Sequence, residues 1–153
     1  MKTVYAHIQH PNLTLTMLHF ISGQGLDPGT PSISLDGTNG KLDPSDGDFV
    51  DIVHTNTENV PEQMGHADFF PNGGFIQPGC PTNSGCSHSR SNQYYIESIT
   101  SNAFRSKNCS SYGEFLAGNC DLNAEAFMGN GVSTDARGNF YLQTNEESPF
   151  AQG

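Results

Sequence analysis

The sequence predicts an α/β fold, and three observations support this prediction. Residues 48–55 contain four aliphatic and aromatic residues in eight, which is typical of a mostly buried strand. Residues 89–101 carry two tyrosines and two isoleucines at roughly helical spacing, which predicts a helix packed on the sheet. Residues 13–22 alternate enough to predict a strand that delivers Asp27 at its carboxyl end. Functional groups of α/β sheets gather at such strand ends, so Asp27 is a candidate site residue.

Weaker patterns complete the expected order of elements. Residues 28–47 are rich in Gly, Pro, Ser, Asp and Asn and predict a long loop. A short strand is expected at 65–70, where a Pro-Asn-Gly-Gly turn follows, and another at 140–144. Residues 110–117 predict a short helix. The chain contains neither an internal repeat nor a linker that would divide it.

Composition and charge exclude several classes of partner. The chain has 153 residues, of which 34% are hydrophobic, and a formal net charge of −10. Binding to nucleic acid requires clustered Lys and Arg, and only six are scattered here, so no nucleic-acid partner is expected. Charge likewise disfavours docking on anionic lipid, so any lipid contact must come from apolar loops. No apolar stretch approaches the length of a transmembrane segment.

The four cysteines form two closely spaced pairs, Cys80 with Cys86 and Cys109 with Cys120. In an extracellular protein this spacing indicates two local disulfides. The alternative is a metal site that contains Cys80, Cys86 and His88. Zinc sites usually repeat a gap of two to four residues in pairs, and this set has no partner, so disulfides are favoured.

The same cysteines suggest a secreted protein. Two Asn-x-Ser/Thr sequons, at Asn12 and Asn108, are compatible with passage through the secretory route. The apolar stretch 13–21 is short and contains Thr and His, so it makes a poor signal peptide. A signal, if there is one, is not expected within this chain.

Asp27 and His88 are candidates for catalysis. Their order along the chain suits hydrolases that carry Ser, Asp and His in that order. Each residue alone has an ordinary structural interpretation, because Asp before Pro commonly forms turns and a lone His is more often structural. The sequence contains no Gly-x-Ser-x-Gly motif for the nucleophile.

Seven segments carry a family resemblance. They are Gly-Leu-Asp-Pro at 25–28, Leu-Asp-Pro-Ser-Asp at 42–46, Phe-Val-Asp-Ile-Val-His-Thr at 49–55, Gly-His-Ala-Asp-Phe-Phe-Pro-Asn-Gly-Gly at 65–74, Gln-Pro-Gly-Cys at 77–80, Cys-Ser-His-Ser-Arg at 86–90 and Ser-Pro-Phe at 148–150. In this order they resemble the pancreatic-type lipase family, which includes the phospholipases A1 of insect venoms and insect digestive lipases. The resemblance implies a partial α/β-hydrolase fold at 25–153, the carboxyl-terminal half of a lipase catalytic domain, with residues 1–24 a divergent or artefactual start.

The resemblance also implies a function and its residues. It implies that Asp27 is the acid and His88 the general base of a Ser-Asp-His triad. It also implies that the substrate is a glycerolipid at a lipid surface. The expected activity is carboxylic ester hydrolysis, as a phospholipase A1 or lipase. Counting back to the family's serine reaches Thr3, in a poorly matching context, so the chain alone is expected to be inactive. The alternative is a non-catalytic, lipase-like binding or yolk-type storage protein.

Two loops have counterparts in the family. In vertebrate members the Leu-Asp-Pro-Ser-Asp loop binds calcium, so Asp43 and Asp46, with the carbonyls of Thr38 and Lys41, could hold a structural calcium. An Asx turn that orders this loop without metal is the alternative, and no cofactor is required for the chemistry.

Cys80 and Cys86 occupy the family positions that bracket the lid over the active site. Only five residues lie between them, far short of the roughly 20 that a helical lid needs at 1.5 Å per residue. In the family a short lid accompanies phospholipase A1-like behaviour. Cys109 and Cys120 match the family's later disulfide.

Overall fold

The described residues form one mixed sheet with helices on both faces. The computed structural model describes residues 4–6, 22–28, 42–57, 63–82 and 85–153. Within these ranges the strands are β1 (Val4–Ala6), β2 (Gly23–Leu26), β3 (Val50–Val53), β4 (Ala67–Pro71), β5 (Arg105–Asn108), β6 (Glu125–Phe127) and β7 (Gly138–Leu142). The helices are α1 (Cys86–Ser98) and α2 (Tyr112–Leu116), with 3-10 turns η1 (Pro44–Asp46) and η2 (Asn72–Gly74).

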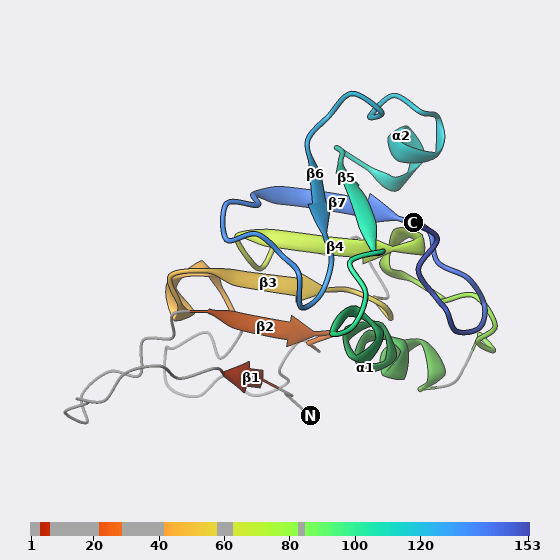
Figure 1. Ribbon diagram of the computed structural model, residues 1–153, viewed down its shortest axis with the longest axis horizontal. Helices are drawn as coiled ribbons and strands as arrows, with labels where there is room; N and C mark the ends of the chain where they lie inside the picture. Colours follow the sequence, from red (N-terminus) through yellow and green to blue (C-terminus); the bar gives the residue numbers. More distant parts are fainter. Residues whose placement is uncertain (1–3, 7–21, 29–41, 58–62, 83–84) are drawn as a thin grey trace.

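The sheet has a parallel centre, which confirms the predicted α/β class. Its strand order is β1-β2-β3-β4-β7-β5-β6 (Figure 1). β2, β3, β4 and β7 pair in parallel, whereas β1, β5 and β6 join antiparallel at the two sides. The carboxyl ends of β2, β3 and β4 therefore share one edge of the sheet, beside α1 in Figure 1. Asp27 and His54 directly follow β2 and β3 at this edge.

Side-chain alternation gives the sheet two apolar faces. On one face, Tyr94 of α1 packs on a core drawn from the four central strands, which includes Leu26, Val53, Phe69, Phe140 and Leu142. On the opposite face, a smaller cluster joins α2 and the second cysteine pair to β4 and β7, and it consists of Phe70, Cys109, Cys120, Tyr141, Tyr112 and Phe115. Helix α1 is thus fixed over the sheet near the strand ends.

Helix α1 confirms the helix predicted at 89–101, although it begins and ends three residues earlier. Its buried side chains are Ser87, Ser91, Tyr94 and Ser98, which lie on one face at helical spacing. Ile96 and Ile99 are exposed, so the expectation that they help to pack the helix on the sheet is wrong. At Ser98 the neighbouring chain comes close, since a Cβ on Gly129 would collide with Ser98 Oγ.

The other expected elements differ in their fit to the structure. β3, β4, β7 and α2 confirm the elements predicted at 48–55, 65–70, 140–144 and 110–117, with shifted ends. The strand before Asp27 is β2; the predicted segment 13–22 lies outside the described residues except for its last residue. β5 and β6 were not predicted, because their sequences Arg-Ser-Lys-Asn and Glu-Ala-Phe lack an apolar run. None of the described helices is long and apolar enough to cross a bilayer.

Candidate active site

Asp27 is held at the end of β2 mainly by backbone groups. Its N–H donates to Val53 O at 2.7 Å, which continues the pairing with β3. Its φ is +49°, a left-handed conformation that Asp adopts more readily than most residues. One carboxylate oxygen, Oδ1, accepts hydrogen bonds from the N–H groups of Thr55 and Asn56 at 2.8 and 2.9 Å. The segment after β3 thus fixes the direction of the carboxylate.

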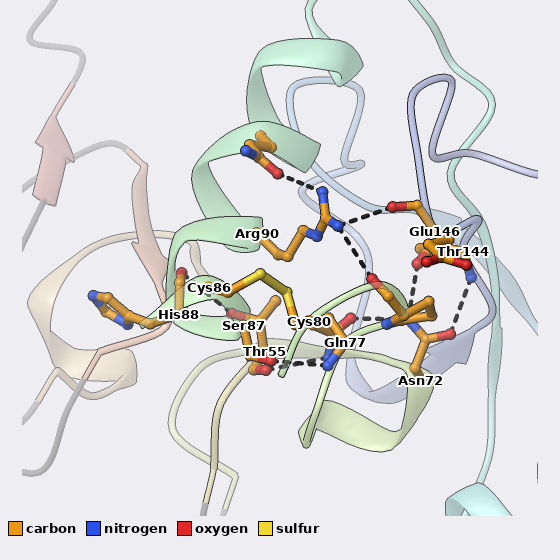
Figure 2. The surroundings of a disulfide bond; sticks show 12 residues. Thr55, Asn72, Gln77, Cys80, Cys86, Ser87, His88, Arg90, Thr144 and Glu146 are labelled. Atoms are coloured by element: carbon orange, nitrogen blue, oxygen red, sulfur yellow. Dashed lines mark hydrogen bonds between the residues drawn. A yellow bond between two sulfur atoms is a disulfide. The ribbon is translucent and has the colours of Figure 1, made fainter. Parts of the chain in front are cut away.

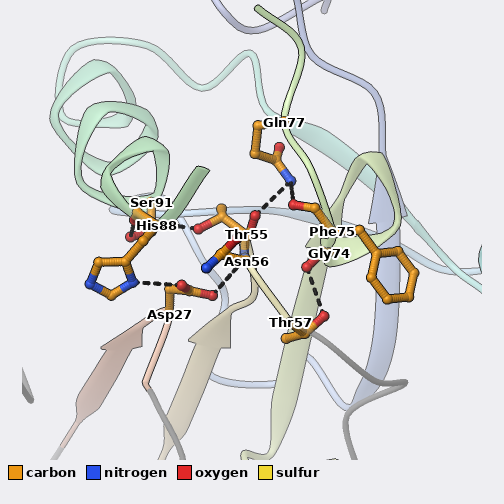
Figure 3. A network of polar contacts seen from close by, with 9 residues as sticks. All are labelled: Asp27, Thr55, Asn56, Thr57, Gly74, Phe75, Gln77, His88 and Ser91. Carbon is orange, nitrogen blue, oxygen red and sulfur yellow. Dashed lines mark hydrogen bonds and ion pairs between the residues drawn. The ribbon is translucent and has the colours of Figure 1, made fainter. Parts of the chain in front are cut away.

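His88 lies in the first turn of α1 and contacts the other oxygen of this carboxylate. Its Nδ1 is 2.6 Å from Asp27 Oδ2 (Figure 3). The His88 side chain is 45% exposed, whereas that of Asp27 is 7% exposed. Among the residues that the structure describes, none hydrogen-bonds to Nε2. An ionised carboxylate only accepts, so Nδ1 carries the proton in the neutral ring and the Nε2 lone pair is free to act as a base.

Both cysteine pairs form disulfides, which confirms that prediction. Cys80 bonds to Cys86 and Cys109 to Cys120. The metal-site alternative is therefore wrong, since both sulfurs near His88 are used; within the described ranges no group of three or more His, Cys, Asp or Glu is arranged to hold a metal. The first disulfide joins the loop after β4 to the first residue of α1, two residues before His88 (Figure 2).

The two acidic residues of the expected calcium loop cap the turn η1. Asp43 Oδ1 accepts from the N–H and the hydroxyl of Ser45, at 2.7 and 2.6 Å, and Asp46 Oδ2 accepts from Asp43 N–H at 2.9 Å. The Ser45 hydroxyl and N–H lower the pKa of Asp43. These bonds use one oxygen of each carboxylate, and the Asp43 bond to Ser45 N–H is the Asx turn that the sequence offered as the alternative. Thr38 and Lys41, the other expected ligands, lie outside the described residues, as does Thr3.

Two buried polar centres near the site had no role in the sequence analysis. His54 Nε2 lies 2.8 Å from Asp68 Oδ1, with both side chains almost fully buried, and the His54 ring stacks on Phe70. Gln77 is 1% exposed; it lies in the loop that follows β4 and η2 and contacts the segment after β3. The only sequence signal for either was its presence in a segment that resembles the family.

Comparison with known proteins identifies the family. A family model described as Lipase matches residues 21–150. The chain belongs to the lipase family. Human inactive pancreatic lipase-related protein 1 is 34% identical over 84% of the chain, and human pancreatic triacylglycerol lipase is 32% identical over the same share. Lipase member H-B of Xenopus laevis is 41% identical over 68% of the chain.

These relatives make it a pancreatic-type lipase chain, as the seven segments indicated. The match covers 35% of each of the two human relatives and 25% of the Xenopus protein, so the chain spans about a third or less of their length. Lipases are carboxylic ester hydrolases. The Asp27–His88 contact lies inside the matched range, at the strand-end edge where α/β sheets bind ligands.

Proposed function

We propose that this lipase chain supplies the acid and the base of a carboxylic ester hydrolase that acts on glycerolipids. The observation that supports it is the 2.6 Å contact between His88 Nδ1 and Asp27 Oδ2, with Nε2 directed away from the carboxylate. Nε2 takes the proton of a serine hydroxyl as this attacks the ester carbonyl, and later gives it to the leaving alcohol. Asp27 holds the ring in the required tautomer and stabilises the imidazolium. The nucleophile comes from outside these 153 residues.

The finer proposal is a phospholipase A1 that cleaves the sn-1 ester of a phospholipid. The five-residue loop between Cys80 and Cys86 is too short to cover an acyl-binding groove, which favours polar glycerolipids over bulk triglyceride. Phe75 and Ile76 are exposed in the loop just before this disulfide and offer apolar contact with a lipid surface. Net charge opposes attraction to anionic lipid, so these side chains carry the contact.

Secretion and a structural calcium complete the proposal. Two disulfides support an oxidising, extracellular location. Of the two sequons, Asn12 lies outside the described residues, and Asn108 on β5 donates through Nδ2 to the carbonyls of Arg137 and Asn139. In this proposal Asp43 and Asp46 hold a calcium ion that orders the loop and takes no part in the ester chemistry.

The second candidate is a non-catalytic, lipase-like binding or storage protein. One relative is named inactive, and this sequence has no Gly-x-Ser-x-Gly motif. The transcript upstream of Met1 separates the two candidates. An in-frame Gly-x-Ser-x-Gly supports the hydrolase, whereas a transcript whose translation starts at Met1 supports the non-catalytic protein.

Activity tests the hydrolase directly. We expect purified 1–153 to hydrolyse neither p-nitrophenyl esters nor phosphatidylcholine above buffer, because its sequence has no Gly-x-Ser-x-Gly motif to supply the nucleophile. In a longer natural chain with the motif, Asp27→Asn should lower kcat by about 10⁴-fold, as expected when the base is held in the wrong tautomer. Turnover by 1–153 that His88→Ala abolishes would contradict the first expectation; an active long chain indifferent to Asp27→Asn would contradict the second.

A further inference from the structure

We propose that Gln77 is a positioning residue that holds Asp27 and His88 in place relative to each other. The proposal rests on the proposed function of that pair and adds a residue to it. Gln77 lies in the Gln-Pro-Gly-Cys segment, between η2 and the Cys80–Cys86 disulfide, and it is almost completely buried. Buried amides must be satisfied internally, so its contacts show what it holds together.

Both the nitrogen and the oxygen of the Gln77 side-chain amide make hydrogen bonds. Nε2 lies within hydrogen-bond distance of the carbonyls of Pro71, Phe75 and Thr55, at 2.9, 3.0 and 3.2 Å. Oε1 accepts from Asn72 Nδ2 at 2.8 Å and from the Tyr94 hydroxyl at 3.0 Å. Three acceptors at one end and two donors at the other leave a single orientation for the amide.

The neighbouring side chains fix the same orientation independently. Thr144 N–H can only donate, and it lies 3.1 Å from Asn72 Oδ1, so Asn72 Nδ2 must face Gln77 Oε1. The Tyr94 hydroxyl has one proton, which it donates to Gln77. It therefore accepts from Thr144 Oγ1 at 2.9 Å. Figure 2 shows Asn72 and Thr144 on the side of Gln77 away from His88.

One peptide group connects Gln77 to Asp27. The Thr55 carbonyl accepts from Gln77 Nε2, and the N–H of the same planar peptide, which belongs to Asn56, donates to Asp27 Oδ1 (Figure 3). A hydrogen bond at the oxygen of a peptide polarises its N–H and strengthens the bond that the N–H makes. Gln77 thus orients this peptide and strengthens the hydrogen bond from Asn56 N–H to the Asp27 carboxylate.

Two contacts on one face of α1 connect Gln77 to His88. Gln77 N–H donates to Ser87 Oγ at 2.9 Å, and Ser87 immediately precedes His88. The Tyr94 hydroxyl meets the Gln77 side chain two turns further along the helix. Contacts seven residues apart on one face fix both the rotation of α1 and its position along its axis. The His88 ring therefore meets Asp27 in a geometry that Gln77 sets from both sides.

The test compares variants by NMR of the 1–153 chain. We expect a low-field ring N–H signal from His88 Nδ1, assigned by its loss in His88→Ala, and a downfield amide signal from Asn56. Gln77→Met keeps the length of the side chain and removes its hydrogen bonds, and we expect it to lose both signals. Ser87→Ala removes only the contact next to His88, so it should shift the ring signal and leave the Asn56 amide unchanged.

Thr144→Val is the matched control. It removes a buried hydroxyl from the same network, but Thr144 contacts neither Ser87 nor the peptide after Thr55. It should lower the melting temperature and keep both signals. If the His88 signal is unchanged in both Gln77→Met and Ser87→Ala, as it should be in Thr144→Val, Gln77 is only structural and the proposal fails. If Gln77→Met does not fold, the His88 signal of Ser87→Ala decides. A wild-type chain without the low-field signal overturns the proposed function itself, and the role of Gln77 with it.

Discussion

At the residue scale, the acid of the candidate pair is positioned by backbone rather than by side chains. Both N–H groups on Asp27 Oδ1 come from the two residues that follow His54, in the segment after β3. Only substitution by proline removes a backbone donor, so the carboxylate keeps its direction through most substitutions around it. The direction of the carboxylate should therefore change only when a side chain that orients this backbone is substituted. Gln77 is such a side chain.

A second buried carboxyl, that of Asp51, makes stability depend on pH. Burial, together with the nearby Asp68 carboxyl, raises the pKa of Asp51 to about 7, against the hydrogen bond from Gln24 Nε2 at 2.5 Å. The folded state therefore keeps a proton that the unfolded chain releases near pH 4. Between about pH 4 and 7 the unfolded state binds fewer protons, so the free energy of unfolding falls as pH rises.

Asp51→Asn should remove this pH dependence. The variant keeps an oxygen for Gln24 and resembles the protonated acid, so its stability relative to wild type should grow from pH 4 to pH 7, by on the order of a few kcal/mol. Denaturant unfolding across this range measures the difference. The exposed Asp135→Asn is the control and should track wild type. A constant difference between Asp51→Asn and wild type at all pH values would refute the raised pKa.

At the scale of elements, prediction succeeded where local sequence and burial agree. Four of the eight residues at 48–55 are apolar, consecutive residues of β3 are buried on both faces, and the strand was found for that reason. β5 and β6 were missed because they are short and largely polar, as the edge strand β6 and its neighbour β5 can be. The helix at 89–101 was found from its spacing, but its packing face was misassigned, because serines that permit close approach carry no hydrophobic signal.

Turn η1 provides the test of calcium binding. If Asp43 and Asp46 hold calcium, millimolar calcium should raise the melting temperature of the wild-type chain. Asp46→Asn retains the oxygen that accepts from Asp43 N–H and so preserves the cap, but it loses the charge and should lose the calcium response. Magnesium at equal concentration is the control, since it demands near-ideal octahedral geometry and gives up its waters reluctantly. Equal responses in the variant and the wild type would reject the site.

At the scale of the whole molecule, charge and exposed apolar residues set the expected contact with lipid. The net charge of −10 gives no attraction to anionic vesicles. We expect binding to phosphatidylcholine vesicles that persists as salt is raised. Replacing Phe75 and Ile76 together by Ser should weaken it about tenfold, from the lost apolar burial.

Leu122→Ser is the control for this measurement. Leu122 is fully exposed, but it lies in the connection between α2 and β6 and not in the loop before the Cys80–Cys86 disulfide. Co-sedimentation with vesicles should show wild-type binding for this variant. Equal losses in both variants would mean that general apolar exposure, and not the loop before the disulfide, makes the contact.

The family and the two candidate residues could be predicted from the sequence because short, ordered segments carry them, whereas the Asp27–His88 distance could not. That contact spans 61 positions and depends on β2, β3 and α1 meeting at one edge of the sheet. The role of Gln77 could not be predicted either: its partners come from three separate segments, and no local pattern marks a buried amide as one that holds others in place.

The tautomer of His88 tests the central claim most directly. Long-range ¹H–¹⁵N NMR of the 1–153 chain, at a pH where the ring is neutral, identifies which ring nitrogen carries the proton. The Asp27 contact predicts a protonated Nδ1 and an unprotonated Nε2, with that preference lost in Asp27→Asn. A protonated Nε2 in the wild-type chain, or a tautomer unchanged by Asp27→Asn, would contradict the assignment of Asp27 and His88 as the acid and base of an ester hydrolase.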